Sequence, residues 1–365
     1  MRVAVVGTGL IGASLGLALR RLDEVGEVVG FDRDDEQLDV ALSRGALDRA
    51  AAGAAEAADG CDVVVLAVPV SAVPRVAAQV AGTLAPGAVL TDVASVKSRV
   101  VDTLQAAAPP GVHVIGGHPM AGSAETGAAH ASADLFVGAT YLLTPTTHTD
   151  PGAYRRLHGL VGRLGARVIA VPPERHDLLV AVVSHLPQLA ATTLMNLAAG
   201  RARDEHAGLL LLAAGGFRDA TRVAASNPDL WLDICAENRD AIVAVLDEYG
   251  GRLASLRATL AEGDDEGLRR RLTQARAARR ALPGKETVTG ALVELRVPIP
   301  DRPGVLAEVT TTVGAAGVNI EDFAIEHAPE GGRGVLRLAV VGPKHAGRAR
   351  EALKARGYEV SERVP

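Results

Sequence analysis

The first residues of this chain constrain its fold more than any other stretch. A short apolar run, Arg2–Val6, leads directly into the turn Gly7-Thr-Gly-Leu-Ile-Gly12, and an alanine- and leucine-rich helical pattern follows. A strand, a glycine turn and a helix in that order make the first half of a β-α-β unit. In such a unit the strands are parallel and the helix covers one face of the sheet.

The same alternation continues to about residue 172. The strand candidates are Arg2–Val6, Glu27–Phe31, Val63–Ala67, Ala88–Asp92, Val112–Gly116, Thr140–Thr144 and Arg167–Val171. Short continuous apolar strands separated by helices are typical of a parallel sheet that is covered on both faces. We therefore predict a Rossmann-type, doubly wound α/β domain over residues 1–173.

The glycine turn predicts a dinucleotide site. Gly7 permits the tight turn, Gly9 lets a pyrophosphate approach the backbone, and Gly12 lets the helix pack closely on the strand. The predicted cofactor contacts in this turn are Gly7, Thr8, Gly9, Leu10, Ile11 and Gly12. Asp32 ends the second strand, where its carboxylate would accept ribose hydroxyls and repel a 2′-phosphate, so NAD is favoured over NADP. Arg33 favours NADP instead, because its guanidinium can hold the 2′-phosphate. The alternative is a capping aspartate after a glycine turn that binds nothing.

Composition narrows the classes of function. The chain has 365 residues, of which 48% are hydrophobic and 2% aromatic, and its formal net charge is -5. Acidic balance and few stacking rings argue against nucleic-acid binding. Cys61 and Cys235 make neither a disulfide framework nor a metal cluster, so we expect a reducing compartment and no metal. We find no cationic leader and no apolar run of the roughly 20 residues that a membrane span needs, and so expect a cytoplasmic protein without membrane contact.

Two further domains are predicted downstream. Residues 174–284 carry leucine, alanine and valine at helical spacing, which predicts an all-helical domain that also forms a homodimer interface. Within it, the apolar stretch Leu209–Ala214 should be buried on all sides, and Pro187 should kink a helix.

Residues 290–365 show the order βαββαβ of a ferredoxin-like unit. Its expected strands are Leu292–Ile299, Val318–His327, Val335–Val341 and Tyr358–Arg363, and its helices Val305–Ala316 and Ala346–Arg356.

Two polar residues are catalytic candidates because each follows a predicted strand end. Ligands of open α/β sheets bind beyond the carboxyl ends of the strands. His118 lies in Gly116-Gly-His-Pro-Met-Ala-Gly-Ser123, and the usual pKa of histidine, about 6.5, suits proton transfer near neutral pH. Taken alone, such a histidine is more often structural. Ser95, in Asp92-Val-Ala-Ser-Val-Lys97, could orient a substrate hydroxyl, or it could be a helix N-cap.

Four residues of the helical region are candidates for substrate contact. Ser184 and Gln188 lie four positions apart, as do Arg218 and Arg222, so each pair would share a helix face. Two aligned guanidiniums suit an anionic substrate, because the planar fork binds a carboxylate through two hydrogen bonds. The alternative for the arginines is a surface pair with Asp219.

In this order, the motifs resemble those of the prephenate/arogenate dehydrogenase family of tyrosine biosynthesis, over nearly the whole chain. The matching stretches are the glycine turn, Asp92-Val-Ala-Ser-Val-Lys97, Gly116-Gly-His-Pro-Met-Ala-Gly-Ser123, Ser184-His-Leu-Pro187, Gly216-Phe-Arg-Asp-Ala-Thr-Arg222 and Trp231-Leu-Asp-Ile-Cys-Ala-Glu-Asn238. The resemblance implies NAD-dependent oxidative decarboxylation of prephenate to 4-hydroxyphenylpyruvate. His118 would take the ring hydroxyl proton, and Ser95 would bridge that hydroxyl and the nicotinamide. Arg222 would hold the side-chain carboxylate, with Arg218 shaping the pocket.

Gln188 departs from that pattern, because many prephenate-using relatives carry a second histidine there. A glutamine can donate and accept hydrogen bonds but cannot become cationic. An arogenate dehydrogenase, which makes tyrosine directly, therefore stays an alternative, as does an NAD-binding amino-acid sensor without catalysis. A β-hydroxyacid dehydrogenase would need a lysine in the helical region, but none occurs between Lys97 and Lys285.

The C-terminal region resembles an ACT domain, a small amino-acid-sensing module. The resemblance is carried by Asp301-Arg-Pro-Gly-Val-Leu306 and by Val318-Asn-Ile320. It implies tyrosine, the end product of the pathway, as an effector, with contacts at Asp301 and Asn319. The alternative is a dimerisation module that binds no ligand.

Overall fold

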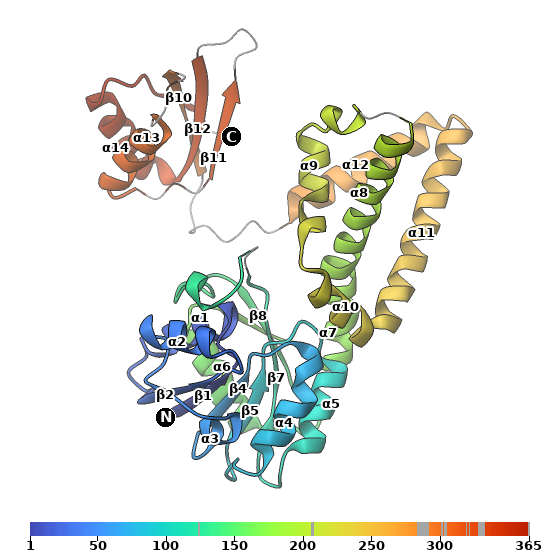
Figure 1. Cartoon of the computed structure of the whole chain (residues 1–365). Helices are drawn as coiled ribbons and strands as arrows, with labels where there is room; N and C mark the ends of the chain where they lie inside the picture. Colours follow the sequence, from blue (N-terminus) through green and yellow to red (C-terminus); the bar gives the residue numbers. More distant parts are fainter. Residues whose placement is uncertain are drawn as a thin grey trace. The chain divides into compact units, whose positions relative to one another are not determined.

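A computed structural model describes residues 1–122, 125–205, 208–282, 292–300, 302, 305–318, 320, 322–327 and 333–363. Its internal contacts divide the chain into two compact units, Met1–Thr273 and Gln274–Pro365, and each is described by itself. The first unit holds the sheets and the helical region, and the second holds the small C-terminal sheet (Figure 1).

The first unit is built on a six-stranded sheet in the order β3-β2-β1-β4-β5-β6, and every neighbouring pair is parallel. The strands are β1 (Arg2–Val6), β2 (Glu27–Phe31), β3 (Arg49–Ala50), β4 (Val63–Leu66), β5 (Val89–Asp92) and β6 (His113–Val114). The crossover helices are α1 (Leu10–Leu19), α2 (Asp35–Ser43), α3 (Ala54–Ala58), α4 (Val73–Ala81) and α5 (Ser98–Ala107). The strand order reverses at β1, whose neighbours are β2 and β4, so the crevice for a ligand opens there. This confirms the predicted Rossmann-type fold.

Two of the expected strands, Thr140–Thr144 and Arg167–Val171, do not join this sheet but form a separate one with a strand that was not expected. β7 (Gly116–Pro119) pairs antiparallel with β8 (Thr140–Thr144), which pairs parallel with β9 (Arg167–Ala170), and α6 (Pro151–Arg163) joins the last two. The expectation of one strand over Val112–Gly116 with His118 in the following loop was therefore wrong. The chain leaves the first sheet after β6, and His118 lies within β7.

Glycine makes this second strand possible. A Cβ atom at Gly116 would lie 2.3 Å from the hydroxyl oxygen of Thr144, and one at Gly117 would lie 2.5 Å from the carbonyl oxygen of Asp92. Only a residue without a side chain fits between β5 and β8 so closely. A pattern of apolar residues cannot show this, because the missing side chains carry the information.

The helical region follows as predicted. Its helices are α7 (Pro173–Val180), α8 (Leu186–Asp204), α9 (Gly215–Thr221), α10 (Pro228–Glu237), α11 (Arg239–Ala261) and α12 (Asp265–Ala281). Between α7 and α8, residues Ala181–His185 form a π-helical turn just before Pro187. A proline ring in a helix collides with the carbonyl four residues earlier, and the wider turn makes room for it. The disturbance expected at Pro187 thus takes the form of a π-turn.

The continuous helical stretch Pro173–Asp204 corrects one expectation. It is 32 residues long with a hydropathy of 1.6 in its most apolar window, so one helix of the described chain reaches the length and composition of a membrane span. Core helices of water-soluble proteins meet the same criterion. Length and composition therefore do not place this helix in a membrane.

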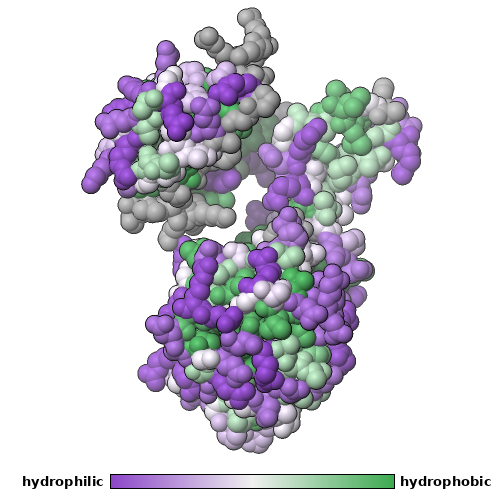
Figure 2. Space-filling model, turned by 60° about the vertical axis from the view of Figure 1, so that its left-hand side comes forward, coloured by the Kyte–Doolittle hydropathy of each residue, from purple (hydrophilic) through white to green (hydrophobic). Residues whose placement is uncertain are grey.

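The apolar stretch Leu209–Ala214 is not buried within the single chain, contrary to expectation. Residues Leu209–Leu212 form a 3-10 turn in which Leu211 is 88% and Leu212 83% exposed. Figure 2 shows hydrophobic side chains on the surface of the helical region. The pattern of apolar residues indicates that a surface is covered, but it does not say whether the same chain or a second one covers it.

The second unit is the predicted βαββαβ module. Its elements are β10 (Leu292–Pro300), α13 (Val305–Ala315), β11 (Asp322–His327), β12 (Arg333–Val341), α14 (Gly342–Ala355) and β13 (Ser361–Arg363). The strands form an antiparallel sheet in the order β11-β12-β10-β13. Leu295, Val309, Leu338 and Leu353 have no exposed surface and join the sheet to both helices. Asp301 and Asn319, the expected effector contacts, lie outside the described residues.

Candidate active site

A cleft of about 600 Å³ lies where the order of the large sheet reverses. Its lining includes Gly7, Gly9, Asp32, Arg33 and Arg75. The cleft therefore contains the predicted glycine turn together with the acidic residue at the end of β2. Thr8 in the same turn is fully buried, and Leu10 and Ile11 are the half-buried first residues of α1.

The three glycines of the turn differ in what surrounds them. Gly7 has a φ of +98°, and a Cβ atom there would lie 2.3 Å from the carbonyl oxygen of Ala67. At Gly12 a Cβ would lie 1.8 Å from the carbonyl oxygen of Gly7, so helix and strand require glycine at both positions. A Cβ at Gly9 would meet no atom within 4 Å. The space beside Gly9 is thus open to a ligand, which fits the predicted approach of a pyrophosphate.

Asp32 is anchored at the mouth of this cleft. Its Oδ2 accepts hydrogen bonds from the backbone N–H of Thr8 at 2.6 Å and from the Thr8 hydroxyl at 3.3 Å. The carboxylate joins the end of β2 to the glycine turn and keeps lone pairs for ribose hydroxyls. Arg33 and Arg75 are exposed residues that line the same cleft. The residues present fit a dinucleotide.

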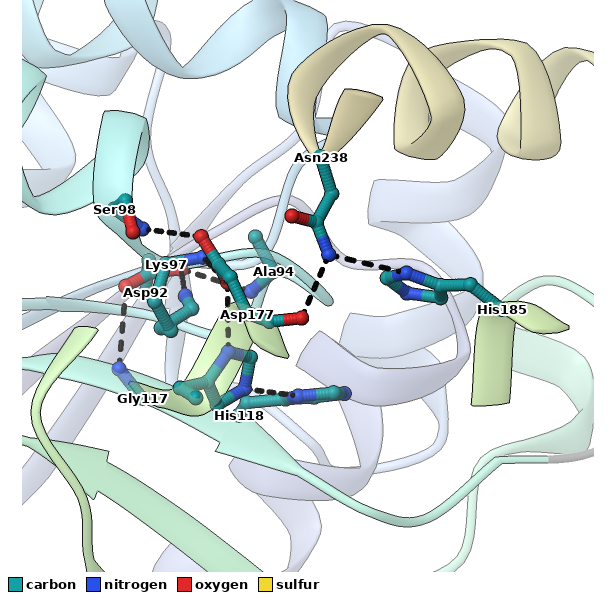
Figure 3. Close-up of polar contacts among 10 residues, drawn as sticks. Asp92, Ala94, Lys97, Ser98, Gly117, His118, Asp177, His185 and Asn238 are labelled. Carbon is teal, nitrogen blue, oxygen red and sulfur yellow. Dashed lines mark hydrogen bonds and ion pairs between the residues drawn. The ribbon is translucent and has the colours of Figure 1, made fainter. Parts of the chain in front are cut away.

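His118 contacts a second histidine that the sequence did not indicate. Its Nδ1 lies 2.8 Å from Nε2 of His176, which belongs to α7. The other ring nitrogen of His176, Nδ1, lies 2.8 Å from Oδ1 of Asp177. Figure 3 labels His118 and Asp177, and its dashed lines follow these contacts. His118 is 9% exposed and His176 is fully buried.

Asp177 also caps helix α5. Its Oδ1 accepts from the backbone N–H of Lys97 at 2.7 Å and its Oδ2 from that of Ser98 at 2.9 Å. Burial alone raises the pKa of the Asp177 carboxyl, but the hydrogen bonds from His176, Ser98 and Lys97 outweigh burial and lower the pKa overall. Asp177 is therefore ionised at neutral pH, and it holds α7 against α5.

A fully buried ion pair supports the strand that carries His118. Lys97 Nζ contacts Oδ2 of Asp92, and neither side chain has exposed surface. The same carboxylate accepts from the backbone N–H groups of Ala94 at 2.9 Å and Gly117 at 3.2 Å. Burial lowers the pKa of Lys97, and Asp92 opposes that effect. Asp92 thus joins the end of β5 to the residue next to His118.

The surroundings keep His118 neutral. Burial lowers its pKa well below the usual 6.5, and the neighbouring His176, Lys97 and His185 lower the pKa further, against a smaller opposing effect of Asp177. A neutral imidazole has one nitrogen without a proton. His118 is therefore able to accept a proton at neutral pH.

A third histidine lies on the other side of Asp177. His185 is 1% exposed, and burial lowers its pKa to about 4. Its Nδ1 lies 3.2 Å from Nδ2 of Asn238, which donates to the backbone carbonyl of Asp177 at 2.9 Å. The stretch ending at Asn238 is thereby joined to the site.

The remaining predicted residues lie around this centre with fewer described contacts. Ser95 is half-buried between β5 and α5, and it is not the cap of α5, because that helix begins at Ser98 after Lys97. Ser184 lies in the π-turn and is half-buried. Gln188 is buried, and its Oε1 accepts from the Ser226 hydroxyl at 3.4 Å.

Arg218 lies within α9, and Arg222 is the C-cap of that helix with right-handed helical backbone angles, so the shared face stays a prediction. Helix α9 ends at Thr221, and Arg222 begins a 3-10 turn. Arg218 and Arg222 are both exposed, and Nε of Arg218 donates to the carbonyl oxygen of Ala213 at 3.1 Å. Among the described hydrogen bonds and ion pairs, none joins either guanidinium to His118 or Gln188.

Residues His176 and Asp177 were missed. The signal available was an adjacent histidine and aspartate soon after Pro172-Pro173, at the start of a helix. Nothing in the sequence says that this pair packs against His118, which lies 58 residues earlier. No group of three His, Cys, Asp or Glu residues suited to a metal ion occurs in the described part of the chain.

Family models match three consecutive parts of the chain. Residues 15–170 match the nucleotide-binding domain of prephenate dehydrogenase, residues 172–274 match its dimerization domain, and residues 293–357 match the ACT domain. The prephenate dehydrogenase of Bacillus subtilis is 33% identical over 98% of this chain and 97% of its own length. The cyclohexadienyl dehydrogenase of Zymomonas mobilis is 34% identical over 77% of this chain and 95% of its own.

Two solved structures are similar over about three quarters of the chain. One is the prephenate dehydrogenase of A. aeolicus in complex with hydroxyphenyl propionate and NAD+, with 30% identity, a TM-score of 0.73 and coverage of 78% of this chain and 98% of that one. The other is the arogenate dehydrogenase of Synechocystis, with 33% identity, a TM-score of 0.69 and coverage of 77% and 99%.

Proposed function

The chain belongs to the prephenate dehydrogenase family, and on that basis we propose that His118 is its catalytic base. The protein is an NAD-dependent dehydrogenase that oxidises and decarboxylates prephenate to 4-hydroxyphenylpyruvate. When bound, NAD+ supplies the hydride acceptor. The observation that carries the assignment of His118 is its buried ring, which is neutral at pH 7 and has one nitrogen, Nδ1, already engaged by His176.

The proposed chemistry at His118 concerns one proton. Nε2 accepts the proton of the ring hydroxyl as hydride leaves the same carbon, and the ring becomes aromatic when CO2 is lost. General-base assistance of this kind is worth about 10²–10⁴-fold in rate. Ser95 would orient the same hydroxyl from the loop between β5 and α5.

Residues 7–12 and Asp32 would hold the cofactor. The turn Gly7-Thr-Gly-Leu-Ile-Gly12 presents its backbone to the open space beside Gly9, and Asp32 would accept the ribose hydroxyls. Arg33 lines the same cleft, so the strictness for NAD over NADP is part of the test below.

We propose that the helical region binds the side-chain end of the substrate. Arg222 would hold the carboxylate, with Arg218 contributing positive charge, and Ser184 and Gln188 would make polar contacts. Gln188 cannot become cationic, and the similarity to an arogenate dehydrogenase favours arogenate as a second candidate substrate.

We further propose three domains, residues 1–173, 174–284 and 290–365, in a cytoplasmic homodimer. The match of residues 172–274 to a dimerization domain supports self-association. The match to the ACT domain supports regulation, with tyrosine as effector and Asp301 and Asn319 as its contacts.

One assay tests these substrate and effector proposals together. Reduction of the nicotinamide is followed by absorbance with prephenate and with arogenate, each with NAD and with NADP, with and without tyrosine. We expect turnover with prephenate and NAD, and a lower rate when tyrosine is added. Turnover with arogenate alone would overturn the substrate assignment, and no turnover with either compound would favour an NAD-binding sensor.

A further inference from the structure

Three ionisable groups form a continuous chain that ends at His118. The Asp177 carboxylate contacts Nδ1 of His176 at 2.8 Å, and Nε2 of His176 contacts Nδ1 of His118 at 2.8 Å. The side chains come from two elements, β7 and α7, and all three residues are buried. None of the three lines the cofactor cleft, and the proposed proton transfer uses only the last member of the chain.

The positions of the protons along this chain follow from the acceptor at its far end. Asp177 is ionised, so His176 must donate from Nδ1. A neutral His176 that donates from Nδ1 has its lone pair on Nε2, so His118 must donate from its own Nδ1. A neutral His118 that donates from Nδ1 has its lone pair on Nε2. Each hydrogen bond therefore fixes the tautomer of the next ring, and Nε2 of His118 is left unprotonated.

Both rings are held in the neutral form that this arrangement requires. Burial lowers the pKa of His176, although the hydrogen bond to Asp177 opposes that effect. Burial also lowers the pKa of His118, and the positive charge of the nearby Lys97 acts in the same direction. The charged and titratable groups around the two rings are Asp92, Lys97, Asp177 and His185.

We propose that His176 and Asp177 are positioning residues that hold His118 as the Nδ1–H tautomer, so that Nε2 faces the reaction as a base. The proposal rests on the role proposed for His118 above. When Nε2 takes the proton, Nδ1 keeps its own, and the positive charge on the ring is stabilised by the Nε2 lone pair of His176 and by Asp177 behind it. Neither His176 nor Asp177 has to touch the substrate in this role.

The same carboxylate caps helix α5, so one residue joins the base to the loop that bears Ser95. Oδ1 of Asp177 accepts from His176 and from the backbone N–H of Lys97, and Oδ2 accepts from that of Ser98. The orientation of His118 is therefore fixed relative to Ser95 by a short set of hydrogen bonds. The contacts that join Asp177, His176 and His118 are called the relay below. Because the Asp177 carboxylate belongs to the relay and also caps α5, a substitution of Asp177 changes both, and a control is necessary.

The first test exchanges the carboxylate for an amide. In Asp177→Asn, the amide N–H can face Nδ1 of His176 and reverse both histidine tautomers, which leaves His118 with a proton on Nε2. We expect kcat to fall about 100-fold or more, as expected when a catalytic histidine is held in the wrong tautomer, with the Kd of NAD unchanged. Asp150→Asn is the matched control, because Asp150 caps α6 through the N–H of Ala153 at 2.7 Å, far along the chain from these residues. Its kcat should stay at the wild-type value.

The second test leaves the cap of α5 intact. His176→Phe keeps a ring of similar size and removes both hydrogen bonds of the relay. We expect a fall in kcat of at least about tenfold, because His118 then populates both tautomers and loses the neighbour that stabilises its charged form. His158→Asn, at an exposed position of α6, controls for removal of a histidine.

The deciding readout is the tautomer itself. Nitrogen-15 NMR of selectively labelled histidine separates Nδ1–H from Nε2–H rings, and the signals of His118 and His176 are assigned by their loss in His118→Asn and His176→Phe. We expect both rings as Nδ1–H in the wild type, and His118 as Nε2–H in Asp177→Asn. An Nε2–H ring at His118 in the wild type would overturn the proposal, as would wild-type kcat in both His176→Phe and Asp177→Asn. If His118→Asn alone loses turnover, the base assignment stands and the relay fails. If His118→Asn keeps turnover, the assignment of His118 as the base fails, and the positioning proposal that rests on it fails as well.

Discussion

The buried ion pair between Lys97 and Asp92 gives the sharpest prediction about stability. In Lys97→Met, the Asp92 carboxylate stays fully buried and keeps only the backbone N–H groups of Ala94 and Gly117. Removing one partner of a buried pair costs about 3–5 kcal/mol, because the remaining charge is left without its counter-ion. Two hydrogen bonds remain, so we expect the lower end of that range, about 3 kcal/mol of unfolding free energy.

A double variant separates the charge from the packing. In the protein that carries both Lys97→Met and Asp92→Asn, the buried pair is replaced by two uncharged side chains, and the amide oxygen introduced at position 92 can still accept from one backbone N–H. We expect this protein to be more stable than Lys97→Met by about 1–2 kcal/mol, since substitutions of contacting residues are not additive. Arg252→Met is the control, because the exposed pair of Arg252 with Glu248 contributes less than about 0.5 kcal/mol.

The assay is urea denaturation followed by circular dichroism, with kcat measured on the same samples. Asp92 accepts the N–H of Gly117, which precedes His118, so Lys97→Met should also lower kcat. A loss below about 1 kcal/mol in Lys97→Met, similar to that of Arg252→Met, would refute the reasoning. So would a double variant that is less stable than Lys97→Met.

Three further predictions concern the cofactor turn, acid stability and the apolar surface. Gly9→Ala should weaken NAD binding, measured by calorimetry, without changing the melting temperature, whereas Gly12→Ala should destabilise the fold, because its Cβ would lie 1.8 Å from the Gly7 carbonyl oxygen. His185 has a folded pKa of about 4 against the usual 6.5, so the unfolded chain binds the proton first as pH falls. Unfolding free energy should therefore fall between pH 6.5 and pH 4, by up to about 3 kcal/mol, and His185→Gln should reduce that fall in urea denaturation. Leu212→Asp should increase the monomer fraction in light scattering, because Leu212 is 83% exposed in the single chain; an unchanged dimer would show that this surface is not the interface.

Local sequence patterns predicted those parts of the fold that depend on short-range spacing and on the order of the elements. The turn Gly7-Thr-Gly-Leu-Ile-Gly12 and the spacing of apolar runs identified the parallel sheet, and the order of elements identified the C-terminal module. The second sheet was missed because it depends on Gly116 and Gly117, whose lack of side chains allows β7 to approach β5 and β8. Periodicity of apolar residues carries no such information.

The active site was predictable only in part, for a related reason. His118 was identified because it lies near a strand end in a glycine-rich stretch. His176 and Asp177 reach it from a helix 58 residues later, and Lys97 is buried beside Asp92. These contacts depend on how α7 and α5 pack together, which sequence spacing does not specify. The exposed Leu211 shows the same limit, since a covering surface can belong to a second chain.

The measurement that tests the role of His118 most directly is the pH dependence of hydride transfer in single turnovers, in the wild type and in His118→Asn. The pKa of His118 is lowered well below 6.5, so the wild-type rate should stay constant from neutral pH through pH 6.5. The rate should fall only at still lower pH, as the base becomes protonated. His118→Asn should bind NAD as the wild type does, react about 10²–10⁴-fold more slowly, and lose the acidic fall in rate. A variant with the wild-type rate, or with the same acidic fall, would contradict the assignment of His118 as the base.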